Sequence, residues 1–434
     1  MSDERTYHVD VLTRVEGEGR FTLRVEDGRV VQSELAIFEA PRFFEAFLRG
    51  RDRDEVIDVV ARICGICPVA YQMSAAAALE AALEVAVPDA LWELRRLLYC
   101  GEWIESHALH VFLLHAPDFL GFASAVEMAA EHKELVERGL RMKKAGNAIL
   151  EALGGRATHP VSPRIGGFSK VPSREKLRAL RDGLEGGLRD AEATVRWAAS
   201  LPMPELDVPY VYVALDAPRY PLERGDAVLI GRPDGTSERV AVDAWDDHFV
   251  ERQVPHSNAL QAVLHDGSTY LTGPAARLHH HAEKLHARAR TLADEVGLPR
   301  SVRNPHRFLV VRCVELVHAF AEALDLVEAY VEPSLAFVPH TPRASIGYGA
   351  TEAPRGLLWH RYALEADGAV ADARIVPPTS QNQARIEADL VALAPQLLSL
   401  PHEDATKLCE QLIRSYDPCI SCATHFLDLR IEGA

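Results

Sequence analysis

The sequence predicts a mainly α-helical protein with smaller β-rich segments, an α+β fold. Apolar residues recur every three or four positions over long stretches, as on the buried face of a helix. Apolar and polar residues alternate, as in strands, near the N-terminus and between about 208 and 271. The chain has 434 residues, 48% of them hydrophobic, with no internal repeat, so we expect one large domain covering 1–434.

The elements are expected in the following order. An N-terminal β segment at about 5–35 contains two strands, Tyr7–Val15 and Phe21–Val31, joined by a Glu-Gly-Glu-Gly turn. Helical periodicity begins near Asp54 and leads into Cys64, and Pro68 should break or restart the helix. Further helices are predicted over 73–86, 89–115, 131–153, 173–200 and 274–330, with two more before Asp417. A β-rich excursion at about 208–271 and a loop-rich stretch with strands at 338–382 interrupt the helices.

The charge and the composition exclude some classes of partner. A formal net charge of −16 argues against a nucleic-acid partner, which would need a basic surface. No apolar run approaches the roughly 20 residues of a membrane span. The first residues lack the basic and apolar regions of a signal peptide, so we expect a cytoplasmic protein unless a partner carries the export signal.

Two Cys-x-x-Cys pairs near opposite ends of the chain are the strongest chemical signal. They are Cys64/Cys67 and Cys419/Cys422, and only folding can bring their four sulfurs together. Four converging thiolates predict a soft-metal site for zinc, nickel or iron–sulfur chemistry, and the first pair alone also fits a redox dithiol. Structural zinc clips usually join nearby cysteines in small domains, which favours a catalytic cluster in this long chain. The other three cysteines lie in apolar helical stretches and are expected to be buried: Cys100, Cys313 and Cys409.

Longer strings around the pairs resemble the two signature motifs of the large, catalytic subunit of nickel–iron hydrogenases. These strings are Arg-Ile-Cys-Gly-Ile-Cys-Pro at 62–68 and Asp-Pro-Cys-Ile-Ser-Cys-Ala-Thr-His at 417–425. Intermediate segments are similar to further motifs of the family, at 14–17, 101–110, 155–160, 352–356 and 378–382. The resemblance spans nearly the whole chain and implies the family's fold, a long helical bundle around a buried bimetallic site.

The resemblance assigns ligands to this site. Cys64 and Cys419 would be terminal ligands of nickel, and Cys67 and Cys422 would bridge nickel to an iron that carries one CO and two cyanides. The residues it assigns to cofactor binding are Arg355 and Thr379, as donors to the cyanides, with Pro354 and Leu358 beside them.

The implied activity is reversible heterolytic cleavage of H2 with transfer of electrons to an acceptor. A base must take the proton, and the candidates are the Cys419 sulfur and the Arg355 guanidine. Arginine is a poor base because its pKa lies above 12. Asp118 and Asp417 match the carboxylates that hold this arginine in the family, and Glu16 matches the residue that passes protons toward solvent.

The resemblance also implies a magnesium site, a processed C-terminus and partner subunits. Glu45, the Ile375 carbonyl and His425 would bind a hydrated Mg2+, a cation that prefers oxygen ligands. A maturation protease would remove residues 426–434 after nickel-insertion proteins had loaded the metal. Electrons would pass to an iron–sulfur small subunit and then to flavin- and NAD(P)-binding diaphorase subunits.

Two departures from the family's commonest pattern indicate a subgroup. Glu18 and Tyr71 stand where many members have histidine. Both are typical of the cytoplasmic, NAD(P)-linked bidirectional and sulfhydrogenase α-subunit branch.

Three alternatives remain at this point. They are an H2 sensor with the same site and low turnover, a structural protein with a zinc-stapled core, and a subunit like the quinone-linked one of respiratory complex I, which lacks the nickel-binding cysteines. Two groups of histidines are interpreted structurally: His107 and His110 as hydrogen-bonding residues, and His279, His280, His281 and His286 as a solvated helix face.

Overall fold

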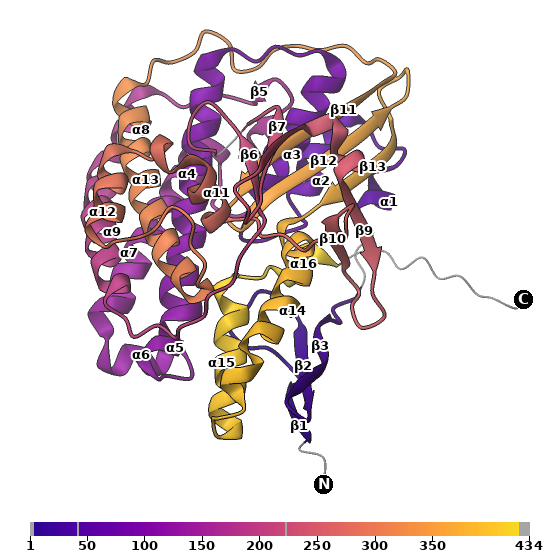
Figure 1. Cartoon of the computed structure of the whole chain (residues 1–434). Coiled ribbons are helices and arrows are strands. Elements are labelled where there is room, and N and C mark those ends of the chain that lie inside the picture. The colour runs from indigo at the N-terminus through magenta and orange to yellow at the C-terminus, as the bar shows by residue number, and fades with distance from the viewer. Residues whose placement is uncertain (1–3, 41–42, 222–223, 425–434) are drawn as a thin grey trace, which may run out of the picture.

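The computed structural model describes residues 4–40, 43–221 and 224–424. Helices gather on one side of the molecule and small antiparallel sheets on the other (Figure 1), so the predicted α+β class is confirmed. In the described ranges, no single helix is long and apolar enough to cross a membrane, although one bent pair, Asp89–Leu120 with Ala125–Glu131, passes that test by length and composition.

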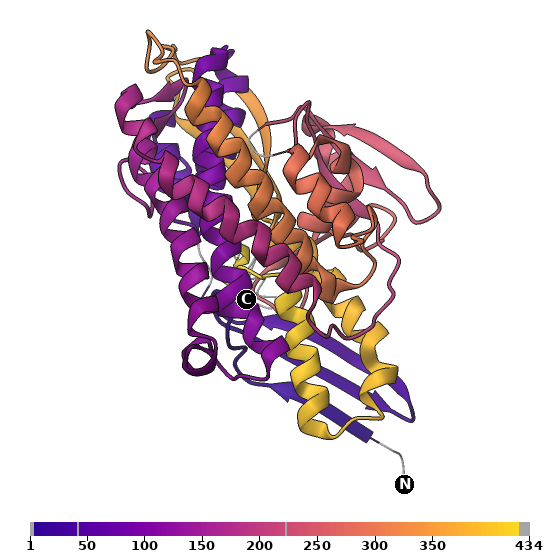
Figure 2. The same ribbon diagram turned by 90° about the vertical axis from the view of Figure 1, so that its left-hand side faces the viewer.

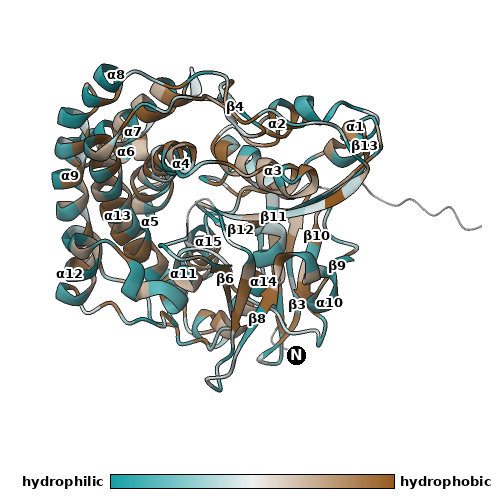
Figure 3. Ribbon diagram, turned by 90° about the horizontal axis from the view of Figure 1, so that it is seen from above, coloured by the Kyte–Doolittle hydropathy of each residue, from teal (hydrophilic) through white to brown (hydrophobic). Residues whose placement is uncertain are grey.

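A bundle of long helices forms the larger side of the molecule. Its members are α4 (Asp89–Leu109), α7 (Lys133–Gly154), α9 (Arg181–Ala199) and α13 (Phe308–Ala329), which lie side by side in Figure 2. The middle helix α13 is apolar almost all round, and most of its residues are buried. In Figure 3 the outer helices α9 and α12 (Ala287–Glu295) show hydrophilic teal toward solvent, whereas α13 inside them is mainly brown.

Shorter elements complete this helical side. The end of α4 continues as a π-helical turn, η1 (His110–His115), and Ser173 caps the next predicted helix through the amide of Lys176. The shorter elements are α5 (Ala116–Leu120), α6 (Ala125–Glu131), β4 (Pro163–Arg164), β5 (Gly167–Phe168), α8 (Arg174–Arg178), α11 (Pro274–His281), η3 (Ala282–Lys284), α12 (Ala287–Glu295) and η4 (Pro305–Arg307). The helices predicted over 274–330 are observed as α11, α12 and α13, with short 3-10 turns between them.

The N-terminal β segment contains three strands where the sequence predicted two. They are β1 (Glu4–Val9), β2 (Gly19–Glu26) and β3 (Arg29–Ile37), paired antiparallel in that order. An Asp27-Gly28 turn divides the single strand predicted over Phe21–Val31, and Asp-Gly is a strong hairpin signal that the alternation obscured. The sheet packs against α14 (Pro378–Leu397) and α15 (His402–Ser415) at the foot of the molecule (Figure 2).

The β-rich excursion is confirmed and has a core of its own. Strands β6 (Tyr212–Asp216), β7 (Ala227–Gly231) and β8 (Ser237–Ala241) form one sheet, and β9 (Phe249–Gln253) pairs with β10 (Leu260–Leu264). Between β8 and β9 lie η2 (Val242–Ala244) and α10 (Trp245–His248). Trp245 stacks on Trp359 at a ring-centroid distance of 5.4 Å, in a small cluster distinct from the main core.

A third sheet joins the two sides of the molecule. It contains β11 (Ser345–Ala353), β12 (Gly356–Leu364) and β13 (Val370–Val376), and β11 lies along α3 (Pro68–Leu83). A Cβ at Gly347 would lie 1.9 Å from the Ala78 carbonyl oxygen, so the strand approaches the helix this closely because it has no side chain there. This contact brings the β11–β12 turn close to the loop that ends at Pro68.

Three short helices flank this region and the cysteine loops. They are α1 (Phe44–Leu48), α2 (Arg53–Val60) and α16 (Ile420–Ala423). The restart predicted at Pro68 is confirmed, because α3 begins at that residue. The division into domains stays a prediction.

Candidate metal centre

The fold brings the four sulfurs of the two cysteine pairs together. The Sγ–Sγ distances are 3.5 Å for Cys64–Cys419, 3.9 Å for Cys67–Cys422 and 2.7 Å for Cys419–Cys422. All four ligand atoms lie within 4.8 Å of one another, all four residues are buried, and none is in a disulfide. In the part of the chain that the structure describes, this thiol cluster is the one group of three or more His, Cys, Asp or Glu side chains with the spacing of a metal site.

The first pair sits in the loop between α2 and α3. The amides of Ile66 and Cys67 donate to the Cys64 sulfur at 3.3 and 3.2 Å, which turns this sulfur inward. Cys67 occupies the N-cap position of α3 but its side chain caps nothing. Instead, the buried carboxylate of Glu102 on α4 accepts from the amides of Val69 and Ala70 at 2.6 and 3.0 Å.

The second pair follows a left-handed residue, Asp417, with φ 54°. The Cys419 amide donates to Thr379 Oγ1 at 2.9 Å, and the Ile420 amide donates to the Glu16 carbonyl at 2.8 Å. Two segments far apart in sequence, the N-terminal loop and the start of α14, therefore hold Cys419 in place.

The thiol cluster does not ionise fully by itself. Burial raises the pKa of Cys419 well above its ordinary value. For Cys64 the effect of burial is outweighed by hydrogen bonds from Cys419, Cys422 and Cys67, so its pKa lies well below the ordinary value. Without a cation the cluster therefore holds a single thiolate, stabilised by the neighbouring thiols, because several negative sulfurs this close together would repel one another.

Glu16 lies next to one of the sulfurs. Its Oε2 accepts from Cys419 Sγ at 3.1 Å and from the Ser421 amide at 3.0 Å. The residue is partly exposed, whereas Cys419 is buried. Glu16 therefore links a buried sulfur to the outer part of the molecule.

Arg355 lies over the cluster from the turn between β11 and β12. Its Nε donates to the Asp417 carbonyl at 2.8 Å and its Nη2 to Asp417 Oδ1 at 3.1 Å. Its Nη1 and Asp417 Oδ2 are buried and have no hydrogen-bond partner among the described residues. Burial lowers the pKa of Arg355, but the Asp417 carboxylate and the sulfurs of Cys419, Cys67 and Cys64 raise it well above the ordinary value. The guanidinium is thus a fixed cation with a free donor.

Asp118, predicted to hold Arg355 together with Asp417, has other partners. Its carboxylate accepts from Arg414 Nε and Nη2, both at 2.8 Å, and from Arg14 Nη2 at 2.6 Å. Burial raises its pKa, but Arg414 and Arg14 outweigh this effect and lower it below the ordinary value. Asp118 therefore ties the N-terminal loop to the end of α15, and Asp417 is the carboxylate that holds Arg355.

The two remaining residues assigned to cofactor binding lie in or beside the same turn. Leu358 is fully buried on β12 and belongs to the hydrophobic cluster that contains the four cysteines. The Pro354 carbonyl accepts a hydrogen bond from Arg277 of α11 at 3.0 Å. Nothing in the sequence pattern around Arg277 indicates this role.

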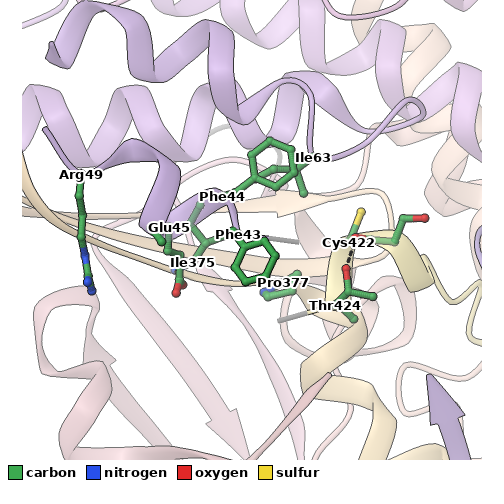
Figure 4. A pocket seen from close by; sticks show the side chains of 12 residues that line it. Phe43, Phe44, Glu45, Arg49, Ile63, Ile375, Pro377, Cys422 and Thr424 are labelled. Atoms are coloured by element: carbon green, nitrogen blue, oxygen red, sulfur yellow. Dashed lines mark hydrogen bonds between the residues drawn. The ribbon is translucent and has the colours of Figure 1, made fainter. Parts of the chain in front are cut away.

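A cavity of about 300 Å3 opens beside the cluster (Figure 4). Its wall includes Glu45, Ile375, Cys422 and Thr424, and Glu45 Oε1 accepts from the Ile375 amide at 2.7 Å. Two of the three predicted magnesium ligands thus touch, through the amide of Ile375. His425, the third, lies outside the described residues.

The two histidine groups behave differently. His107 bonds Glu315 Oε2 at 2.9 Å and His110 bonds the Arg414 carbonyl at 2.7 Å, so their hydrogen-bonding role is confirmed. The prediction of a solvated helix face is wrong at 279–281, whereas His286 is partly exposed and caps α12 by accepting from the Arg288 amide at 3.2 Å. His280 and His281 bond carbonyls of β6 at 3.0 and 2.9 Å, and His279 stacks on Tyr212, because α11 covers the free edge of that strand.

Sequence reasoning missed two buried charged residues that position the site, Glu102 and Arg277. A carboxylate in the apolar run Leu-Leu-Tyr-Cys-Gly-Glu-Trp-Ile is a signal that could have drawn attention to Glu102. Arg277 sits in Ala-Ala-Arg-Leu-His, where an exposed position is equally compatible with the pattern.

Comparison with known proteins identifies the family. A profile described as nickel-dependent hydrogenase matches residues 42–170 and 265–425. Sulfhydrogenase 1 subunit alpha from Pyrococcus furiosus is 32% identical over 97% of this chain and 98% of its own length. Sulfhydrogenase 2 subunit alpha from the same organism is 34% identical over 97% of this chain and 99% of its own length.

A solved structure supports the same assignment. The chain superimposes on an NAD+-reducing NiFe hydrogenase in the H2-reduced state with a TM-score of 0.88 and 28% identity, covering 97% of this chain and 99% of that one. The thiol cluster with Arg355 above it, the profile match and the near full-length relatives agree: this chain belongs to the nickel-dependent hydrogenase family, as a large, catalytic subunit.

Proposed function

We propose that this subunit catalyses reversible heterolytic cleavage of H2 at a nickel–iron centre whose iron carries one CO and two cyanides. The observation that carries the proposal is the group of four buried sulfurs within 4.8 Å of one another, supplied by two pairs from opposite ends of the chain. Cys64 and Cys419 would be the terminal ligands of nickel, and Cys67 and Cys422 the bridging ones.

The chain's own residues fit this group. Soft thiolates are suitable ligands for nickel, and the positive metal ions would balance the negative charge of four closely spaced sulfurs. The Arg355 Nη1 donor is buried without a partner, and leaving such a donor unpaired costs about 1–3 kcal/mol. A cyanide nitrogen is an acceptor of the right kind for it. When bound, a nickel–iron centre supplies Lewis acidity that polarises H2 and the redox capacity for its two electrons.

The proton released from H2 follows a short route in this proposal. The Cys419 sulfur accepts it, and Glu16 takes it from the sulfur across 3.1 Å and passes it outward. The Ser421 amide holds the Glu16 carboxylate at the sulfur. Arg355 remains protonated, held by Asp417, and acts as a donor and a fixed positive charge rather than as the base.

Three neutral residues shape the pocket for the diatomic ligands. Leu358 would exclude water from these ligands, and Pro354 belongs to the turn that carries Arg355. Thr379 contributes its hydroxyl, which also accepts from the Cys419 amide.

We place Mg2+ beside the cavity of Figure 4, with Glu45, the Ile375 carbonyl and His425 as ligands and water in the remaining positions. The support is the contact between Glu45 and Ile375 at the wall of that cavity. Removal of residues 426–434 by a maturation protease, after nickel-insertion proteins have acted, would leave His425 as the C-terminal residue.

Electrons would leave through other subunits. In the described residues the cysteines outside the thiol cluster are buried and form no second group with metal-site spacing. An iron–sulfur small subunit is therefore the expected acceptor. The likeness to an NAD+-reducing hydrogenase supports a link to NAD(P), which flavin- and NAD(P)-binding diaphorase subunits would provide. The proposed location is cytoplasmic.

Infrared spectroscopy and metal analysis of the purified protein test the proposal together. Absorption from bound CO and cyanide, with nickel and iron in equal amounts, is expected. Zinc alone, without these bands, would refute the nickel–iron centre and support a zinc-stapled cluster. Cys409→Ser serves as the matched control for cysteine variants, since Cys409 is equally buried and lies outside the cluster.

A further inference from the structure

A second buried arginine lies behind the turn that carries Arg355. Arg277, on α11, is fully buried and uses all five of its N–H donors. Its Nε and Nη2 donate to the two oxygens of Glu315 at 2.7 and 2.8 Å, and its Nη1 donates to Glu352 Oε2 at 2.8 Å. The guanidinium also lies over the ring of Trp103 at 4.2 Å. These contacts hold the Arg277 guanidinium in a single orientation.

The remaining two hydrogen bonds of Arg277 reach the turn itself. Its Nη1 donates to the Ala353 carbonyl and its Nη2 to the Pro354 carbonyl, both at 3.0 Å. These are the two peptide groups immediately before Arg355. No other guanidinium among the described residues donates to the carbonyls of 353 and 354.

The segment before Arg277 holds the other half of the turn. Thr272 Oγ1 accepts from the Leu357 amide at 2.8 Å. Gly273 has φ 113°, and a Cβ there would lie 2.7 Å from the Arg355 carbonyl oxygen, so any other residue would push the turn away. Asn382 fixes Thr272 in turn, by accepting from its amide and donating to its carbonyl.

We propose that Arg277, with Thr272 and Gly273, forms a clamp that sets how deeply the Arg355 guanidinium reaches toward the four sulfurs. Arg277 is a positioning residue: it touches the peptide groups on one side of Arg355, while Asp417 holds the side-chain end. The inference rests on the proposed function only in assigning Arg355 a task at the metal centre.

The position of the Arg355 guanidinium depends on the backbone that carries it. A displacement of about 1 Å in a catalytic group costs up to about a hundredfold in rate. The Arg355 guanidinium sits at the end of a long side chain, so the backbone must be fixed before the side chain can be. Asp417 alone cannot fix it, because the Asp417 residue belongs to the other wall of the site, next to Cys419.

Arg277→Lys is the test variant, because it keeps the buried positive charge next to Glu315 but cannot supply five donors in one plane. We expect nickel and iron content to be unchanged, the cyanide bands to shift, and kcat for H2 oxidation to fall ten- to a hundredfold with KM for H2 within about twofold. Amide hydrogen exchange at 355–357 should accelerate at least about tenfold in the purified protein, with or without bound metal.

Arg95→Lys is the matched control. Arg95 is also fully buried and makes a two-pronged ion pair, with Glu80, and it bonds the Arg164 carbonyl instead of the turn. This control should leave the bands, kcat and exchange at 355–357 unchanged. Equal losses in the two variants would overturn the proposal in favour of a general packing role, as would unchanged exchange and kcat in Arg277→Lys.

A third variant covers the case in which Arg277→Lys does not accumulate. Thr272→Val is nearly isosteric and removes only the acceptor for the Leu357 amide, so it should show the same band shift and faster exchange to a smaller extent. Unchanged exchange in Thr272→Val would then overturn the clamp. Absence of CO and cyanide bands in the unaltered protein would instead refute the proposed cofactor, and the exchange comparison would still decide the clamp.

Discussion

Replacing Glu16 by Gln tests the proton route most directly. The substitution preserves the size of the side chain and an oxygen that can accept from the Ser421 amide, at 3.0 Å in the unaltered protein. It removes the ionisable carboxylate, whose Oε2 also accepts from Cys419 Sγ at 3.1 Å. The folded chain and its metal content should therefore persist while proton transfer fails.

The size of the effect separates two explanations. Loss of one hydrogen bond of ordinary strength costs about 0.5–1.5 kcal/mol, a factor of roughly two to thirteen. Loss of a general acid–base group costs about a hundred- to ten-thousandfold in rate, equivalent to roughly 3–5 kcal/mol in the barrier. We expect the larger value, because a primary amide neither accepts nor releases a proton near neutral pH.

The assay is exchange of D2 with solvent protons, followed by mass spectrometry, with nickel and iron determined on the same preparation. Glu18→Gln is the control, because Glu18 is a neighbouring but exposed carboxylate. Solvent exchange within about tenfold of the unaltered rate, in a fully metallated Glu16→Gln protein, would show that protons leave by another route.

Three further substitutions test the remaining parts of the site. Cys422→Ser should abolish assembly of nickel and iron, measured by metal analysis, whereas the Cys409→Ser control should retain both; normal metal content in Cys422→Ser would contradict its assignment as a ligand. Arg355→Lys should keep the metals and lower kcat about a hundredfold, because lysine cannot donate to Asp417 and to a diatomic ligand at once; an unchanged kcat would remove the guanidinium from the mechanism. Asp118→Asn should lower the free energy of unfolding by about 3–5 kcal/mol at pH 7, since it removes the carboxylate shared by Arg14 and Arg414 and leaves Arg414 with only the longer ion pair to Glu410, at 3.5 Å. The folded pKa of Asp118 is depressed, so this stabilisation is present above the unfolded value of about 3.9 and is lost as pH falls through the folded pKa; a difference between the two proteins in denaturant unfolding that stays constant from pH 7 down to pH 3 would contradict the ion pair.

Local patterns predicted the elements well and the long-range pairing of charges less well. The restart at Pro68 and the cap at Ser173 were predictable because they depend on neighbouring residues alone. The convergence of the cysteines came from motif resemblance, and the contact between Glu16 and Cys419 agrees with it.

Buried charges show why the rest could not be predicted. The carboxylate of Asp118 pairs with two arginines, and periodicity does not say that these are Arg14 and Arg414 rather than Arg355. His280 and His281 looked solvated because a short polar run on a helix gives no sign that a strand edge lies beneath it. Arg277 was missed for the same reason: its five hydrogen bonds reach two distant segments, Glu315 and residues 352–354.

The separation of the two cysteine pairs has a consequence for the timing of biosynthesis. Cys64 and Cys419 are 355 positions apart, and translation adds about 5–20 residues each second, so the ribosome needs about 20–70 s to pass from one to the other. During that interval the nascent chain presents a two-thiol site with no second pair to close it. Such a half-site binds zinc or copper as readily as nickel. The metal that occupies this centre therefore depends on relative rates of binding during translation. Factors that keep the first pair metal-free until Cys422 has emerged would determine which metal is bound.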